Sequence, residues 1–273
     1  MRKKVELMIL AVFTGIFHSL VFINPLEKEV AIGEVFLQLS GSRGRFSLGY
    51  SIAELLCFFL CLMPGLLLLF FLGLRLYGHF CTASIYVFCR YTKRIVWYRK
   101  VVLSLIREIV LFQITFLITI LLCSELRFNL YWMEQDEKII IFHFLSFLLW
   151  NLLWIMVMNL ISIEKGSSQG ILFVMGIQMG MLGCLSLINN LNRQGVEIEI
   201  IHGLIRCNPI SVLVTGWHKL GPLTEENIGN RTFLSPIVSL GILWIATLTV
   251  LIYGGIRVAK KEIIVENMEW REG

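Results

Sequence analysis

Cationic side chains gather within residues 80–100, between two strongly apolar runs. Written on a helix, spacings of three and four place a mostly apolar set on one face: Phe80, Ser84, Val87, Phe88, Tyr91, Ile95, Tyr98 and Val102. The other face collects the cations and one aromatic ring: Arg90, Lys93, Arg94, Trp97 and Lys100. Such a helix can rest its apolar side at a membrane and present its cations to a partner or to lipid headgroups.

Two charged side chains are expected inside an apolar segment. Arg107 and Glu108 lie in the first turns of a predicted span over residues 101–123, because residues 109–123 alone are too short to cross a hydrocarbon core of about 30 Å. Charges there are costly unless they pair with another helix or extend toward the surface. Asn151 and Asn159 fall within a later predicted span. They are either functional groups or form hydrogen bonds that join neighbouring helices.

The composition indicates which elements carry these side chains. Hydrophobic residues make up 57% of the 273, and charged residues 16%, against about 25% in a soluble domain. The mean hydropathy is +0.78. We therefore predict one all-α integral membrane domain over residues 1–273, with Pro64 bending the second of six transmembrane helices. The expected spans are 5–23, 52–74, 101–123, 139–163, 170–191 and 236–256.

The charge distribution predicts the orientation. If the termini and residues 75–107 face the cytoplasm, the inner segments hold 15 of the 24 Lys and Arg residues but 7 of the 19 acidic residues. The outer segments are then residues 26–50 and 192–235, with one shorter loop between them. Because basic side chains resist translocation, we expect a multi-pass protein of the cell membrane with both termini in the cytoplasm.

The run Tyr86-Val-Phe-Cys-Arg90-Tyr-Thr-Lys93-Arg94-Ile-Val-Trp97-Tyr98, together with the order of the spans, resembles permease subunits of ABC-2-type transporters, with a type V exporter-like transmembrane domain. It is most similar to Gram-positive permeases that accompany peptide-antibiotic (bacteriocin or lantibiotic) transport or immunity systems. The resemblance implies an ABC ATPase partner and a second permease subunit, identical or paralogous. It also implies that residues 192–235 form a re-entrant pair, whereas the loop at residues 26–50 is longer than is typical of the family. The residues implied to contact the ATPase are Tyr86, Arg90, Lys93, Arg94, Trp97 and Lys100.

The chain lacks the Gly-x-x-x-x-Gly-Lys-Ser/Thr phosphate loop, so ATP is expected to be bound by the partner subunit. No catalytic residue, metal or cofactor is expected in this chain, and no enzymatic activity. Glu225 and Glu226 followed by Arg231 resemble the paired glutamates of a membrane-embedded protease family, but the spacing differs by one residue. Nucleic acid is not an expected partner of the cations, because membrane spans flank them. The expected function is export or clearance of a peptide or amphipathic compound, and the alternative is a non-transport immunity or sensor protein that binds an external peptide.

Overall fold

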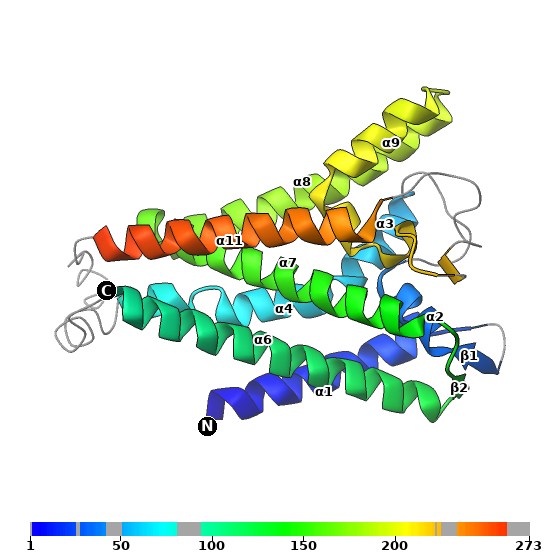
Figure 1. Ribbon diagram of the computed structural model, residues 1–273, viewed down its shortest axis with the longest axis horizontal. Coiled ribbons are helices and arrows are strands. Elements are labelled where there is room, and N and C mark those ends of the chain that lie inside the picture. The colour runs from blue at the N-terminus through cyan, green and yellow to red at the C-terminus, as the bar shows by residue number, and fades with distance from the viewer. Residues whose placement is uncertain are drawn as a thin grey trace.

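The computed structural model describes residues 2–25, 28–41, 51–80, 94–221, 223–224 and 234–260. Within these ranges, six helical segments are long and apolar enough to cross a membrane, and they pack as one bundle (Figure 1). The prediction of an all-α multi-pass membrane protein is confirmed at this level. The six segments are Lys4–Phe22, Met63–Phe80, Arg94–Glu125, Asp136–Lys165, Ser167–Arg193 and Pro236–Lys260.

The outer surface of the bundle is apolar, as the composition requires. In α11 (Pro236–Lys260), only 22% of the most apolar stretch is buried. Its isoleucines stand outward, with Ile237 exposed by 82% and Ile245 by 63%. In water such a surface would be strongly unfavourable, so this face of α11 is suited to contact lipid or another apolar surface.

Most spanning helices extend beyond their expected bounds. Helix α6 (Arg94–Glu125) begins at Arg94 rather than at residue 101, so the last part of the basic segment forms its first turns. The remaining long helices are α1 (Arg2–Phe22), α7 (Asp136–Lys165) and α8 (Ser167–Arg193). Helix α1 packs closely on α6, where a Cβ at Gly15 would lie 2.8 Å from Thr119 Cβ. Apolar content locates a span well, but helix ends also depend on contacts that hydropathy does not record.

The second span departs most from expectation, because it is interrupted twice. Residues 52–74 were expected to form one bent helix. Instead, α3 (Ile52–Cys61) ends before Leu62, and α4 (Met63–Leu72) begins with Pro64 in its first turn. A second interruption falls at Gly73 and Leu74, after which residues 75–80 are helical again. A capping box between Ser51 and Glu54 fixes the start of α3, so this terminus is satisfied locally.

The first interruption has a chemical cause. Proline has no N–H, so Pro64 cannot donate to the carbonyl of Leu60, four residues earlier. His18 Nε2, on α1, lies 3.1 Å from that carbonyl oxygen. The His18 Nδ1 lies 2.8 Å from the Thr14 carbonyl oxygen, and a neutral imidazole carries one N–H. The tautomer protonated at Nε2 is the one that donates to Leu60 and replaces the missing backbone bond. A neighbouring helix thus satisfies the carbonyl that Pro64 leaves free.

This contact predicts a rescue. His18→Leu is expected to lower the free energy of unfolding by about 2 kcal/mol, since the Leu60 carbonyl loses its donor inside the bundle. Adding Pro64→Ala restores an N–H at the right position and should recover part of that loss. Unfolding of the purified protein in detergent measures the four variants of the cycle. The same effect of Pro64→Ala in both backgrounds would contradict the role of His18.

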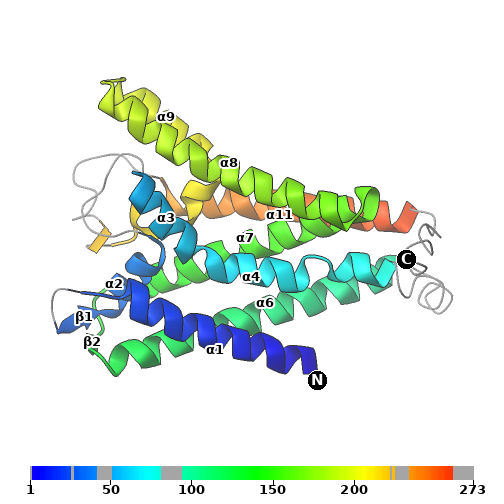
Figure 2. The same ribbon diagram turned by 180° about the vertical axis from the view of Figure 1, so that it is seen from behind.

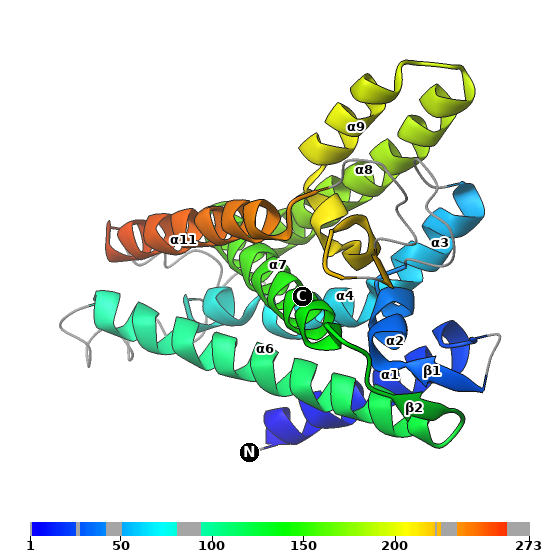
Figure 3. The same cartoon turned by 45° about the vertical axis from the view of Figure 1, so that its right-hand side comes forward.

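The shorter elements lie at one end of the bundle (Figure 1). Strand β1 (Glu29–Ala31) pairs in parallel with β2 (Asn129–Tyr131), and α2 (Ile32–Leu39) follows β1. Beside them, the Arg127 guanidinium donates to the Ser19 carbonyl at 2.6 Å and to Asn24 Oδ1 at 3.1 Å, which joins the ends of α1 and α6. The segment expected to be re-entrant holds α9 (Ile198–Cys207), η1 (Pro209–Leu213) and η2 (Thr215–Trp217). Helix α9 runs back along α8, and the pair extends away from the other helices (Figure 3).

One buried histidine in this segment lies outside the spanning helices. Burial lowers the pKa of His218 to about 4. Its Nδ1 lies 3.1 Å from the Val214 carbonyl and its Nε2 3.1 Å from Ser239 Oγ on α11. The neutral ring can donate at Nδ1 and accept at Nε2, so it ties η2 to the start of α11 without a charge.

The start of α1 and the end of α11 lie at the opposite end from the strands (Figure 1). Which end faces the cytoplasm remains a prediction from charge. Four exposed lysines test it in a variant without its seven cysteines. We expect an impermeant maleimide to label Lys138→Cys and Lys219→Cys in intact cells but not Lys165→Cys or Lys260→Cys. The reverse pattern would invert the orientation.

Candidate functional site

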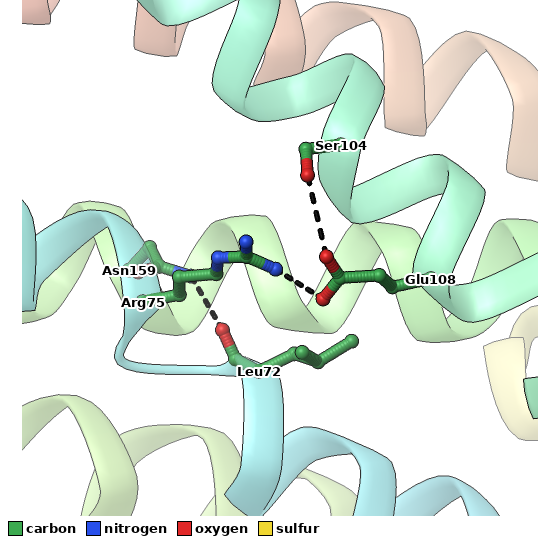
Figure 4. Close-up of polar contacts among 5 residues, drawn as sticks. All are labelled: Leu72, Arg75, Ser104, Glu108 and Asn159. Carbon is green, nitrogen blue, oxygen red and sulfur yellow. Dashed lines mark hydrogen bonds and ion pairs between the residues drawn. The ribbon is translucent and has the colours of Figure 1, made fainter. Parts of the chain in front are cut away.

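A buried ion pair lies at the second interruption of the second span (Figure 4). Arg75 is the first residue after Gly73 and Leu74, and its guanidinium donates to the carboxylate of Glu108 on α6. Glu108 is 6% exposed and also accepts from Ser104 Oγ at 3.3 Å. A charge inside the span was expected to need a partner on another helix, and Arg75 is that partner for Glu108.

The two neighbouring charges of α6 have opposite environments. Glu108 faces into the bundle, whereas Arg107 is exposed. Arg107 was one of the residues expected to make intramembrane polar contacts, and in the structure it does not share the site of Glu108. The residue that does so, Arg75, was missed as a site residue. The available signal was its position directly after the apolar run at 52–74.

Asn159 on α7 satisfies the backbone at the same interruption. Its Oδ1 accepts from the N–H groups of Leu76 at 2.8 Å and Tyr77 at 3.2 Å. Its Nδ2 donates to the Ile155 carbonyl at 2.8 Å and to the Leu72 carbonyl at 3.5 Å (Figure 4). A helix that stops and restarts leaves such groups without intrahelical partners. The fully buried Asn159 amide therefore acts as a cap supplied by another helix.

Asn151, also on α7, lies at the first interruption. Its Nδ2 donates to the Phe147 carbonyl of its own helix at 2.8 Å. Its Oδ1 faces the first turn of α4, where a Cβ on Gly65 would lie 2.8 Å away, so glycine leaves room for the amide. Helix α7 thus places one asparagine beside each interruption of the second span. Both asparagines were expected to make intramembrane polar contacts, and the structure adds which backbone each one meets.

The structure describes only some of the residues implied to contact the ATPase. Tyr86, Arg90 and Lys93 lie outside them. Arg94 is half-buried and Lys100 is exposed, both in the first two turns of α6.

Trp97 differs from expectation. Helical periodicity placed it with the cations, yet it is 5% exposed. Its ring contacts those of His79 and Phe80, with centroids 6.1 and 5.7 Å away. Packing against the end of the second span therefore decides its orientation.

The first turns of α6 also hold α11. The Tyr98 hydroxyl donates to the Leu251 carbonyl at 2.9 Å. A Cβ at Gly254 would lie 2.5 Å from the Tyr98 hydroxyl, and one at Gly255 3.1 Å from Ile95 Cδ1. Glycine therefore allows the two helices to approach closely here. The second span, α6 and α11 meet around the last turns of the basic segment.

The site lies where the backbone of the second span is interrupted. Within the described ranges, no group of three or more His, Cys, Asp or Glu side chains could hold a metal ion. What the site offers is a discontinuous helix, an ion pair between two helices and an amide that holds the free backbone groups. Discontinuous helices in membranes typically occur where a pathway or a moving part needs irregular backbone. Comparison of the chain with protein-family models, curated proteins and solved structures finds no significant match.

Proposed function

We propose that the chain is the membrane-spanning permease subunit of an ABC transporter of the ABC-2 type. A separate ATPase subunit supplies ATP hydrolysis, and a second permease subunit, identical or paralogous, forms the other half. The cargo is a peptide or an amphipathic compound that is exported or cleared from the cell membrane of a Gram-positive bacterium. The proposal combines the resemblance of the basic segment with the multi-pass helical architecture.

One observation carries the mechanical part of the proposal. The two flanks of the basic segment are fixed to each other, because Trp97 packs against His79 and Phe80. A partner that pulls on this segment therefore acts on the second span and on α6 together. The Arg75–Glu108 ion pair joins the same two helices farther along, beside the second interruption. If the basic segment is displaced, the resulting backbone change is expected at this interruption, because the backbone there lacks some of its intrahelical hydrogen bonds.

The ATPase contact can be tested by charge reversal. Arg90→Glu with Arg94→Glu places two anions where the proposal requires cations for docking. We expect the variant to insert normally and to lose association with the ATPase, or to lose transport-linked ATP hydrolysis. Copurification in mild detergent, with partners identified by mass spectrometry, measures the association.

A matched control reverses two cations at the other end of the molecule. Arg193 and Arg206 are exposed on the α8–α9 pair, and Arg193→Glu with Arg206→Glu should leave ATPase association unchanged. If the Arg90 and Arg94 variant also keeps full association and transport, the coupling role is wrong. Failure of the wild-type chain to copurify with any ATPase, together with retained binding of an external peptide, would favour the immunity or sensor function.

A further inference from the structure

A cleft between α4, α7 and α8 contains polar groups without partners. These three helices lie together in the view of Figure 2, and the end of α3 and η1 complete the walls. The lining is mainly aromatic, aliphatic or sulfur-containing, and includes Phe147, Trp150, Trp154 and Met175. Such side chains favour an apolar ligand, and methionine adapts its shape to one.

Gln178 on α8 is the first of the polar groups. It lines the cleft and is only 7% exposed. Within the part of the chain that the structure describes, its amide makes no hydrogen bond. Among the described residues, the fully buried polar atoms without a partner do not include those of the Gln178 amide, so this amide stays accessible to a partner from outside the chain.

Trp154 on α7 supplies a second unpaired group in the same cleft. It is 8% exposed, and its indole Nε1–H finds no acceptor among the described residues. Its ring packs edge-on against Trp150, with centroids 5.5 Å apart. Asn151 adds an acceptor, because its Nδ2 is used by the Phe147 carbonyl while its Oδ1 lies at the Gly65 side of the cleft.

These groups define the chemistry of a ligand. Trp154 offers a donor, Asn151 an acceptor and Gln178 both kinds of group, and none of the described residues that line the cleft is charged. A neutral group that both accepts and donates would match them, as an amide does. An ester would accept from Trp154 but leave the acceptors unpaired, and an ion would meet no countercharge.

The size of the cleft limits how a ligand can sit. The enclosed space is about 20 Å³, room for one small group. Met179, at the rim, is 45% exposed, so the cleft opens toward the outer surface of the bundle. Only the polar end of a ligand enters, and its apolar remainder lies along the surface between α4 and α8.

We propose that this cleft binds an apolar ligand through a neutral amide group, such as the capped end or backbone of an apolar peptide. The assignment deepens the proposed transport function by naming the chemical class of cargo, and its relevance to transport rests on that function. Gln178 pairs with the amide in both directions, and the Trp154 N–H donates to its carbonyl oxygen. The site lies beside the first interruption of the second span, where Leu62 and Gly65 form part of its wall.

Photolabelling of the purified full chain in lipid nanodiscs tests the assignment without any ATPase. The probe is N-acetyl-photoleucyl-leucinamide, whose diazirine labels adjacent side chains on illumination. We expect labelled peptides from the α7 and α8 walls of the cleft. Unlabelled N-acetyl-leucyl-leucinamide should compete, whereas isoamyl isovalerate, an apolar ester without N–H groups, should not. Equal competition by the ester, or labelling elsewhere only, would overturn the proposal.

Two variants remove the polar groups while keeping the apolar shape. Gln178→Leu and Trp154→Phe are each expected to reduce labelling about tenfold, the loss that follows from removing one hydrogen bond to a buried ligand group. Because Gln178 is unpaired in the free protein, Gln178→Leu should not lower the melting temperature, so loss of labelling would not reflect unfolding. The control is Gln113→Leu, which alters a buried glutamine of α6 whose amide donates to the Phe144 carbonyl at 2.8 Å. Unchanged labelling in both cleft variants would contradict the assignment.

The outcome is separable from that of the proposed function. Specific labelling without ATPase association would keep the amide site and remove the transporter assignment. ATPase association without labelling would keep the transporter and remove the site.

Discussion

Arg75→Leu is expected to lower the free energy of unfolding by about 3 kcal/mol, because it leaves the Glu108 carboxylate buried without its cation. The value is taken at the low end of the range for buried pairs, since the Arg75 side chain is 32% exposed. The double variant Arg75→Leu with Glu108→Leu should be more stable than Arg75→Leu alone, because neither charge then remains to be desolvated. Unfolding of the four variants in detergent gives the coupling energy of the pair.

Arg107 provides the matched control for this cycle. It is the same residue type, it is adjacent to Glu108 in sequence, and it is exposed. Arg107→Leu is therefore expected to change the free energy of unfolding by no more than about 0.5 kcal/mol. Equal losses in Arg75→Leu and Arg107→Leu would show that the ion pair does not stabilise the bundle.

The second large effect concerns Asn159. Asn159→Leu removes the acceptor of two N–H groups and the donor to the carbonyls of Leu72 and Ile155. We expect a loss of about 3 kcal/mol, since buried backbone groups are left unpaired. Hydrogen exchange at the Leu76 and Tyr77 amides should accelerate, because both N–H groups lose the Asn159 Oδ1 acceptor.

Asn151→Leu separates this effect from a general loosening of α7. Asn151 lies on the same helix but faces the first turn of α4, so exchange at Leu76 and Tyr77 should stay near the wild-type rate. Mass spectrometry of peptides that cover residues 72–80 measures both variants. If Asn151→Leu accelerated exchange there as much as Asn159→Leu, the capping role of Asn159 would be refuted.

The sequence located the spans because a long apolar run is a local property. Hydropathy places α7 and α8 within a few residues of their observed ends. Pro64 also predicted a bend at the first interruption, because the absence of its backbone N–H can be read directly from the sequence. The second interruption, at Gly73 and Leu74, has no such mark, and its free backbone groups are tolerated because Asn159 reaches them from a distant part of the chain.

The site shows the same limit. Arg107 and Glu108 are neighbours in the sequence, and only the packing of α6 decides that Glu108 turns inward to Arg75. Periodicity placed Trp97 among cations, but the contacts with His79 and Phe80 bury it. The sequence does not show whether the hydrogen-bonding groups of Gln178 and Trp154 are satisfied, because this depends on neighbours elsewhere in the fold.

The length of α6 makes it a lever. Its 32 residues correspond to about 48 Å at the helical rise, well beyond the roughly 30 Å of a hydrocarbon core. The end near the strands is held to α1 through Arg127, so that end would be the fixed point of a tilt of the helix. A rotation of roughly 10° about it would carry the Arg94 end through roughly 8 Å, by the same helix length. A small angular change would therefore become a displacement close to the roughly 8–10 Å between the axes of packed helices, at the end of α6 that forms the last part of the basic segment.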